Sequence, residues 1–288
     1  MDLECYKIDR VKIEQVIIGE IIASDGDGPL NDAQILVEAF RAATAATIDQ
    51  QDVGVLFSGG LDSTIIAILA SEISKVTLYS VGVEGSHDIE AGRSAAEELG
   101  LTWEPIFINE DQVVQAVQEM VKLTGSHNPV SLSFQIPMYF VSRQAKEHLL
   151  VSGQGADELF AGYARYSVMS VEEKGRQMET DMAKLMDETL HQEQKVALAA
   201  GKDLRYPFLH TASVDAVNRI PLERRVGFET SKELLREVGR MIGAGFLAER
   251  KKKAAQYGSG AMRALKANAR RQGLTVRALI AGMSEEGR

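Results

Sequence analysis

The stretch that decides the fold is Val53-Gly54-Val55-Leu56-Phe57-Ser58-Gly59-Gly60-Leu61-Asp62-Ser63. Its first five residues form a continuous apolar run, which is typical of a strand buried on both faces of a sheet. A loop with two glycines follows, and an apolar helix is predicted over residues 63–73. This order predicts an anion-binding loop, because a helix start has unpaired N–H groups and the positive end of the helix dipole.

The residue types in this loop suit a polyphosphate. Gly59 and Gly60 let the backbone approach an anion and adopt positive φ angles, and Ser58 and Ser63 add hydroxyl donors. Asp62 is out of place beside an anion unless it holds a Mg²⁺ ion that bridges the phosphates. The Gly-Lys-Ser/Thr tripeptide of a Walker A loop is missing, which favours release of pyrophosphate over transfer of the γ-phosphoryl group. The alternative is an ordinary strand–turn–helix with a capping serine.

Strands and helices alternate on both sides of this loop. Apolar runs predict strands over 76–82, 103–108 and 149–152, and amphipathic patterns predict helices over 32–48, 88–99, 111–123 and 133–147. The alternation indicates an α/β fold, a parallel sheet with helices on both faces. After Tyr163 the sequence predicts helices alone, over 171–200, 211–219, 231–242, 262–272 and 275–282. We expect them to form a C-terminal helical layer that packs against the sheet.

Length and composition bound the organisation of the chain. The 288 residues, 45% of them hydrophobic, suffice for one large α/β domain. We expect an N-terminal extension over 1–30, with an Ile- and Val-rich stretch (3–22) that could pair as two strands, and one domain over 31–288 with a soft sub-boundary near 165. No apolar run approaches the ~20 residues of a membrane span, and the start lacks the pattern of a signal peptide. Cys5 is the single cysteine, so we expect a cytoplasmic protein without an internal disulfide.

The net charge of −9 is unevenly distributed. Residues 1–223 contain 17 Lys and Arg against 35 Asp and Glu, whereas residues 224–288 contain 15 against 6. A basic C-terminal part on an acidic body predicts that phosphate is handled near the C-terminal part. A solvated basic surface is the alternative. The overall acidity argues against strong binding of nucleic acid.

Two strings together resemble a known family. Ser58–Ser63 resembles the SGGxDS signature of the PP-loop, or N-type ATP pyrophosphatase, superfamily, whose fold is of the adenine nucleotide alpha hydrolase-like type. Residues 151–163, VSGQGADELFAGY, resemble the SGEGxDELFGGY motif of the asparagine synthetase family. Segments 80–100, 204–210, 232–237 and 250–260 also resemble elements of its synthetase domain, so the resemblance covers about residues 32–265.

The resemblance implies a role for each matching residue. The β- and γ-phosphates would be held by Ser58, Gly59, Gly60, Asp62 and Ser63. Mg²⁺ would be bound by Asp62 and Asp157. The adenine and ribose side would be lined by Leu56, Val81 and Gly153. Pyrophosphate would be faced by Lys232 and Arg236, and the α-phosphate and acyl group by Lys252, with Lys253 as the alternate. The implied catalytic residues are Asp62, Asp157 and Lys252.

The implied reaction joins ATP and a carboxylate into an acyl-adenylate with release of pyrophosphate, and ammonia then forms an amide. Asparagine is the default product. Family members that use glutamine begin with a glutaminase domain, and the roughly 50 residues before the first strand are too few to form one. Cys5 is not placed to act as an N-terminal nucleophile. We therefore expect ammonia that is free or supplied by a separate glutaminase subunit, or an amine already on the substrate.

Other departures keep the substrate open. Gln154 stands where the family has Glu, and glutamine can neither act as a base nor attract a cation. His210 replaces an Asp and Ala161 a Gly, which we interpret as tolerable packing changes. The alternatives are a PP-loop enzyme that acts on another acid, an internal amine or an RNA base, and an ATP-binding protein without catalysis. The oligomeric state is open, and a homo-oligomer is compatible with the sequence.

Overall fold

The computed structural model describes residues 30–227, 231–247 and 258–283. The stretch 3–22, most of the expected extension 1–30, Cys5, Lys252 and Lys253 lie outside the described residues. None of the described helices is long and apolar enough to cross a membrane.

A five-stranded parallel sheet forms the centre of the fold, in the order β3-β2-β1-β4-β5. The strands are β1 (Asp52–Leu56), β2 (Lys75–Gly82), β3 (Thr102–Phe107), β4 (Leu149–Val151) and β5 (Asp203–Arg205). The chain runs outward from β1 through β2 to β3 and then returns to β4 on the other side of β1. The carboxyl end of β1 is therefore a topological switch point, where open α/β sheets bind their ligands.

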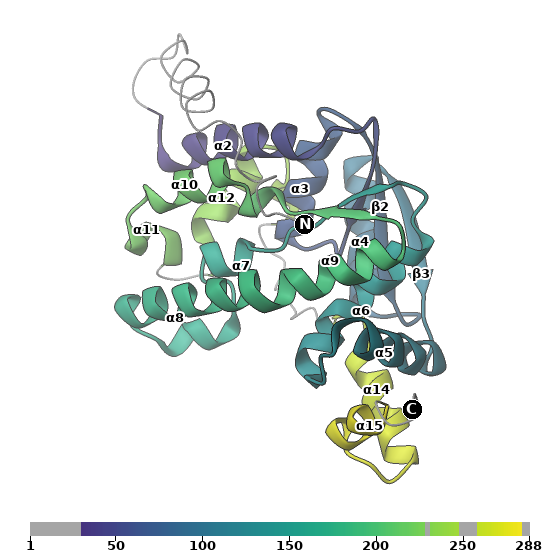
Figure 1. The fold of residues 1–288 in the computed structure, drawn as a ribbon. Coiled ribbons are helices and arrows are strands. Elements are labelled where there is room, and N and C mark those ends of the chain that lie inside the picture. Colours follow the sequence, from purple (N-terminus) through teal and green to yellow (C-terminus); the bar gives the residue numbers. More distant parts are fainter. Residues whose placement is uncertain (1–29, 228–230, 248–257, 284–288) are drawn as a thin grey trace.

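Helices cover both faces of the sheet, as predicted, because successive strand side chains point to opposite faces. Val53 and Val55 of β1 belong to one buried cluster, and Leu56 packs against the other. The first cluster contains side chains of α2 (Asp32–Thr47), α3 (Leu61–Ser71), α4 (His87–Leu99), α10 (Thr211–Asn218) and α12 (Glu233–Met241). The second contains side chains of α5 (Glu110–Thr124), α6 (Pro129–Gln144), α9 (Leu190–Ala199), α14 (Ala261–Arg271) and α15 (Val276–Gly282). Figure 1 shows α2, α10 and α12 in its upper part and α5, α6, α14 and α15 in its lower part.

Most predicted elements are present with boundaries shifted by a few residues. Asn31 caps α2 in a capping box with Gln34. The helix predicted over 171–200 consists of α8 (Val171–Lys184), a π-helical stretch (Leu185–Thr189) and α9. The remaining short elements are α7 (Ala156–Leu159), η2 (Ala164–Val168), η4 (Pro207–Leu209), α11 (Leu222–Val226) and η5 (Gly245–Leu247).

The expectation that the chain is all-helical after Tyr163 is wrong. Residues 203–205 form β5, which pairs in parallel with β4 and places Arg205 beside Val151. The strand has only three residues and one fully buried side chain, Leu204, so it has no readable period-2 pattern. Strand β5 is therefore the edge strand of the sheet, next to β4, which leads into the motif at residues 151–163.

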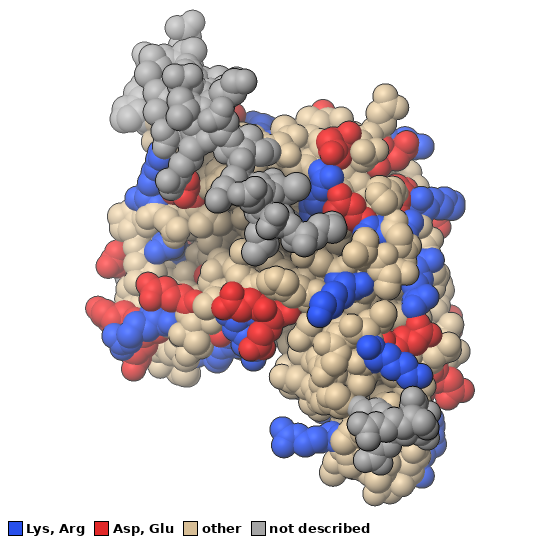
Figure 2. All heavy atoms as spheres, in the orientation of Figure 1, with Lys and Arg blue, Asp and Glu red and all other residues tan. Residues whose placement is uncertain are grey.

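The basic C-terminal part is only partly associated with the sheet. Residues 258–283 contain five Lys and Arg and no Asp or Glu, and all five basic side chains are exposed. Helices α14 and α15 form a projection below α5 and α6, and Lys and Arg side chains extend from that region in Figure 2. A third of the fifteen basic residues after position 223 are thus a solvated surface, and the charge asymmetry alone does not locate a phosphate site.

Candidate active site

The glycine loop lies at the carboxyl end of β1, as predicted. Gly60 is the N-cap of α3, so that Asp62 and Ser63 stand in the first turn of the helix. The hydroxyl oxygens of Ser58 and Ser63 lie 3.3 Å apart, and the N–H of Gly60 donates to Ser58 Oγ. The loop therefore presents a helix start and two hydroxyl groups at one point.

Gly59 has a structural requirement beyond the approach of an anion. Its φ angle is +68°, and a Cβ atom there would lie 2.3 Å from the carbonyl oxygen of Ala91 in α4. A left-handed conformation and a close backbone contact both exclude larger residues. Gly60 has a negative φ of −85° and no such backbone contact, so α4 constrains the first glycine only.

The second motif brings Asp157 to the same place. After β4, residues 152–155 form a loop, and α7 starts behind Gly155, whose φ is +97°. A Cβ atom on Gly153 would lie 3.0 Å from the backbone carbon of Asp62 and 3.1 Å from the backbone nitrogen of Ser63. The loop after β4 therefore lies against the first turn of α3, which allows Asp157 to face Asp62.

Lys232 joins the two aspartates. Its Nζ lies 2.6 Å from Oδ2 of Asp62 and 2.6 Å from Oδ1 of Asp157, and its side chain is 3% exposed. Burial alone would lower the pKa of Lys232, but the carboxylates of Asp157 and Asp62 outweigh burial and raise this pKa above its usual value. Gly162 lies directly against Asp157 and Lys232, since a Cβ there would lie 1.9 Å from Asp157 Oδ1 and 2.1 Å from Lys232 Cε.

The two aspartates suit a magnesium ion by their chemistry. Each offers a carboxylate oxygen, the donor type that Mg²⁺ prefers, and the lysine ammonium shows that the pair accommodates a cation between them. Within the described ranges, no group of three or more His, Cys, Asp or Glu could hold a metal ion. Asp62 and Asp157 would hold Mg²⁺, and the ion would supply neutralisation of charge on phosphate oxygens.

The other predicted site residues lie around this centre. Leu56 ends β1 and pairs with Tyr79 of β2, and Val81 stands two residues further along β2, buried in the second cluster. With Gly153 they mark the carboxyl ends of three neighbouring strands. Arg236 is one turn along α12 from Lys232, and its guanidinium donates to the carbonyl of Leu247. The roles of these residues stay predictions.

Lys252 lies outside the described residues, but its described neighbours in the chain are placed. Leu247 is buried beside α12, the helix that Lys232 begins. Ser259 is fully buried, and its carbonyl accepts a hydrogen bond of 2.9 Å from the N–H of Val83, directly after β2. The described residues on either side of Lys252 thus contact α12 and the end of β2.

Two buried acids near this edge are not among the predicted site residues. Glu158 accepts a hydrogen bond from the hydroxyl of Tyr163, and burial raises the pKa of Glu158 to about 7. Glu193 on α9 accepts one of 2.9 Å from the hydroxyl of Tyr206, and burial raises the pKa of Glu193 to about 7 as well. Glu158 stands inside a quoted motif, and its tyrosine five residues on was a usable signal. Glu193 has no sequence signal, because tertiary packing alone brings it to Tyr206.

Two departures from the motifs have structural consequences. Ala161 has a φ of +48°, a left-handed conformation that costs a non-glycine residue about 1 kcal/mol. The interpretation of Ala161 as a simple packing change is therefore incomplete. His210 is buried and its Nδ1 accepts from the N–H of Ala212, so it caps α10 as an Asp would.

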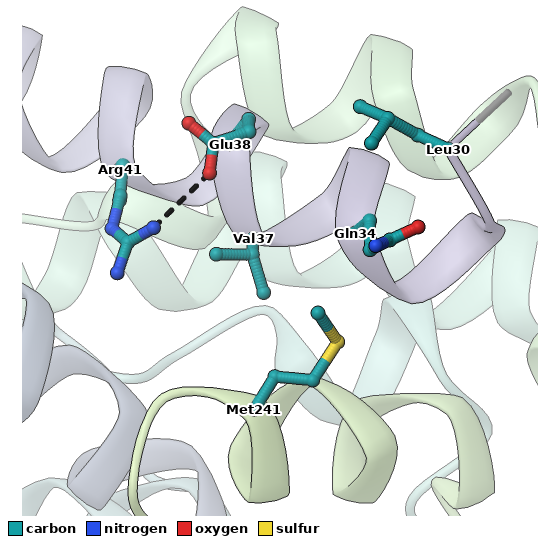
Figure 3. A pocket seen from close by; sticks show the side chains of 6 residues that line it. All are labelled: Leu30, Gln34, Val37, Glu38, Arg41 and Met241. Carbon is teal, nitrogen blue, oxygen red and sulfur yellow. Dashed lines mark hydrogen bonds and ion pairs between the residues drawn. The ribbon is translucent and has the colours of Figure 1, made fainter. Parts of the chain in front are cut away.

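A hollow of about 210 Å³ lies elsewhere, between α2 and the end of α12. Figure 3 shows its lining, to which Val37, Arg41 and Met241 contribute. Met241 is nine residues along α12 from Lys232, which is about 13 Å at the helical rise per residue. The hollow is therefore separate from the aspartate–lysine centre.

The comparison with protein families decides the class of this site. The model of the family described as "Asparagine synthase" matches residues 36–179 and 171–278. The chain belongs to the asparagine synthase family. The matched residues include the glycine loop, Asp157, Lys232 and Lys252. Membership in the asparagine synthase family indicates an ATP-using synthetase domain of the PP-loop type, which confirms the predicted resemblance and fold class.

Curated relatives are similar over part of their length. The "Putative asparagine synthetase (glutamine-hydrolyzing) 1" of Methanocaldococcus jannaschii is 32% identical over 247 residues, which cover 72% of this chain and 46% of the relative. The glutamine-hydrolyzing asparagine synthetase of Pisum sativum root is 27% identical, and the match covers 60% of this chain and 32% of the relative. That of Gallus gallus is 28% identical, and the match covers 64% of this chain and 35% of the relative. The chain therefore spans less than half the length of these relatives.

Solved structures resemble this chain more distantly. An NMN synthetase from Francisella tularensis has a TM-score of 0.41 at 14% identity and covers 88% of this chain and 85% of its own. An NH3-dependent NAD synthetase from Campylobacter jejuni has a TM-score of 0.39 at 13% identity and covers 90% and 95%.

Proposed function

We propose that this chain binds ATP with Mg²⁺, activates a carboxylate as an acyl-adenylate with release of pyrophosphate, and forms an amide with ammonia. The observation that carries the proposal is the convergence of Asp62, Asp157 and Lys232 beside the glycine loop. Three segments that are distant in the chain meet there, at the switch point of the sheet. Membership in the asparagine synthase family supports the same chemistry.

The phosphates of ATP would bind at the start of α3. The N–H groups of the first turn and the hydroxyls of Ser58 and Ser63 are donors for phosphate oxygens. Asp62 and Asp157 would hold Mg²⁺, which supplies neutralisation of charge on the phosphate oxygens. Lys232 keeps its charge because its pKa is raised, and it holds the two carboxylates together.

The reaction requires positioning and charge stabilisation rather than a protein nucleophile. A substrate carboxylate oxygen attacks the α-phosphorus, the bond from that phosphorus to the bridging oxygen breaks, and pyrophosphate leaves. Ammonia then attacks the acyl carbon and loses a proton, and AMP leaves with the bond between the acyl carbon and oxygen broken. Lys252 is proposed to stabilise charge at the α-phosphate and the acyl group.

The amine and the acid are further parts of the proposal. Ammonia would arrive free or from a separate glutaminase subunit, in the cytoplasm. Aspartate is the acid that the family name supplies, but Gln154 replaces a carboxylate at the acyl end. A different acid, an internal amine or an RNA base is therefore the second candidate.

Pyrophosphate release with ATP, Mg²⁺ and a panel of carboxylates tests the proposal. Turnover that needs aspartate and ammonia supports the asparagine-forming reaction. Turnover with another acid or with RNA supports the second candidate. Tight binding of ATP without pyrophosphate under any of these conditions would refute adenylation and leave an ATP-binding protein.

A further inference from the structure

A second polar group lies at the same edge of the sheet, on the face opposite to α3. Helices α6 and α9 each lead through a short turn into a parallel strand, β4 and β5. Such a helix must run from the carboxyl edge of the sheet toward the edge where the next strand begins. The N-terminal halves of α6 and α9 therefore lie toward the edge of the sheet that holds the active-site loops.

Three side chains in the N-terminal halves of α6 and α9 hydrogen-bond one another. Nε2 of Gln135 donates 2.9 Å to Oε1 of Gln192, and the hydroxyl of Ser131 donates to the same oxygen at 3.3 Å. Because both bonds end on its oxygen, Gln192 has its amide orientation fixed. Its Nε2 has no hydrogen bond to another described residue and remains a donor on a half-buried side chain.

Gln135 adds an acceptor to this donor. The residue is fully buried, and its Oε1 has no hydrogen-bond partner in the described part of the chain. A buried unfilled acceptor costs about 1–3 kcal/mol, so a group of this kind in a native protein calls for a ligand or a water. The donor of Gln192 and the unfilled acceptor of Gln135 lie on two hydrogen-bonded side chains. Together they are complementary to an uncharged ligand group that both donates and accepts hydrogen bonds.

The group borders the candidate active site. Tyr206 directly follows β5 and donates to Glu193, the neighbour of Gln192. The carboxyl group of Glu193 interacts electrostatically with that of Glu158, which adjoins Asp157. The N–H of Ser152 donates a hydrogen bond of 3.0 Å to the carbonyl of Arg205, the residue before Tyr206. The loop that holds Gln154 therefore starts beside Tyr206.

The group is also poor in charge. Its side chains are a hydroxyl, two amides and a carboxyl whose pKa burial raises to about 7. None of the hydrogen bonds or ion pairs described for Ser131, Gln135, Gln192 or Glu193 involves Lys or Arg. A second carboxylate placed here would lose its hydration without gaining a cation, which is unfavourable.

We propose that Ser131, Gln135 and Gln192, together with Gln154, form the acyl-substrate side of the site and select a carboxylic acid whose second polar group is an uncharged amide or hydroxyl. The inference rests on the proposed adenylation, whose acid it narrows. Gln192 would donate to the second polar group of the substrate and Gln135 would accept from it, and the bond from Gln135 to Gln192 orients the amide of Gln192.

Isosteric acids test this selection. We would measure, by calorimetry, the binding of succinamate against succinate and of glutaramate against glutarate to the full chain loaded with Mg²⁺ and α,β-methylene-ATP. The monoamides are expected to bind at least about tenfold more tightly, which corresponds to one unmade hydrogen bond to a buried polar group. Gln192→Leu is expected to remove the preference, whereas Gln115→Leu, on the exposed side of α5, should keep it.

Two results would overturn the selection: dicarboxylates that bind as tightly as monoamides, or a preference that survives in Gln192→Leu. Binding of none of the four acids would also overturn it. Pyrophosphate release, measured in parallel with ATP, separates this inference from the proposed function. Binding of the monoamides without pyrophosphate release would contradict the proposed adenylation alone. Pyrophosphate release together with tighter binding of the dicarboxylates would contradict the selection of an uncharged polar group alone.

Discussion

The ammonium of Lys232 donates a 2.6 Å hydrogen bond to Asp62, although 170 residues separate them in the chain. The same ammonium reaches Asp157, so one buried cation neutralises both predicted magnesium ligands. Lys232 and Mg²⁺ would therefore share the same two carboxylates. The ammonium keeps the two carboxylates close to each other. It contacts one oxygen of each carboxylate, and a carboxylate has further lone pairs that can bind a metal.

Lys232→Met should lower the stability of the metal-free protein, because two facing carboxylates lose their cation. Breaking a buried pair costs about 3–5 kcal/mol, and we expect roughly 1–3 kcal/mol here because both aspartates are 22% exposed. Mg²⁺ should then raise the melting temperature of the variant more than that of the wild type. Lys184→Met, an exposed lysine on α8, is the control, and an equal Mg²⁺ response in all three proteins would contradict the shared site.

Gly162→Ala should disturb the same centre without backbone strain. Gly162 has no positive φ angle, but its new Cβ would overlap with Asp157 Oδ1 and Lys232 Cε. We expect kcat/KM for pyrophosphate release to fall at least about tenfold, because a displacement of catalytic groups by about 1 Å lowers the rate by that factor or more. Gly282→Ala, where a Cβ would meet nothing within 4 Å, should keep full activity. Equal activity of the two variants would show that Asp157 and Lys232 are not needed in this arrangement.

Glu193→Gln should change how stability depends on pH. The folded protein raises the pKa of Glu193 to about 7 from 4.5, so the native state keeps a proton that the unfolded state has lost. The contribution of Glu193 to stability is therefore complete below pH 4.5 and is lost as the pH rises through 7. Urea unfolding at pH 5 and pH 8 should show the wild type losing up to about 3 kcal/mol more than the variant. Parallel profiles would mean that Glu193 is charged in the folded state.

Gln154→Glu should restore a carboxylate at the acyl end of the site. If this position sets the acid, pyrophosphate release with aspartate should rise at least about tenfold, because a carboxylate can attract the substrate's ammonium group. The steady-state rate with aspartate and ammonia measures this directly. An unchanged rate would place the choice of acid elsewhere, for example at Gln192.

Local pattern was sufficient to predict the centre of the fold. The apolar run of β1, the glycine loop and α3 are contiguous in sequence, and their order predicts a loop at a strand end. Asp157 was predictable by resemblance, because its motif is also contiguous. The caps of α2 and α5 are short local signals of the same kind.

What the sequence did not predict depends on tertiary contacts. Strand β5 is too short to show a period, and its partner β4 fixes it. The position of Lys232 between two aspartates follows from the packing of α12 against α2 and α3, not from its neighbours in the chain. The amide pair of Gln135 and Gln192 joins two helices 57 residues apart, and no motif indicates it.

Pyrophosphate release by Asp62→Ala tests the central claim most directly. Asp62 is proposed to hold the metal at the triphosphate, so the variant should fold, bind ATP and release no pyrophosphate with any acid that the wild type uses. Asp52→Ala, which removes only an exposed ion pair with Lys75, should release it at the wild-type rate. Wild-type pyrophosphate release by Asp62→Ala would show that the aspartate–lysine centre does not activate the carboxylate.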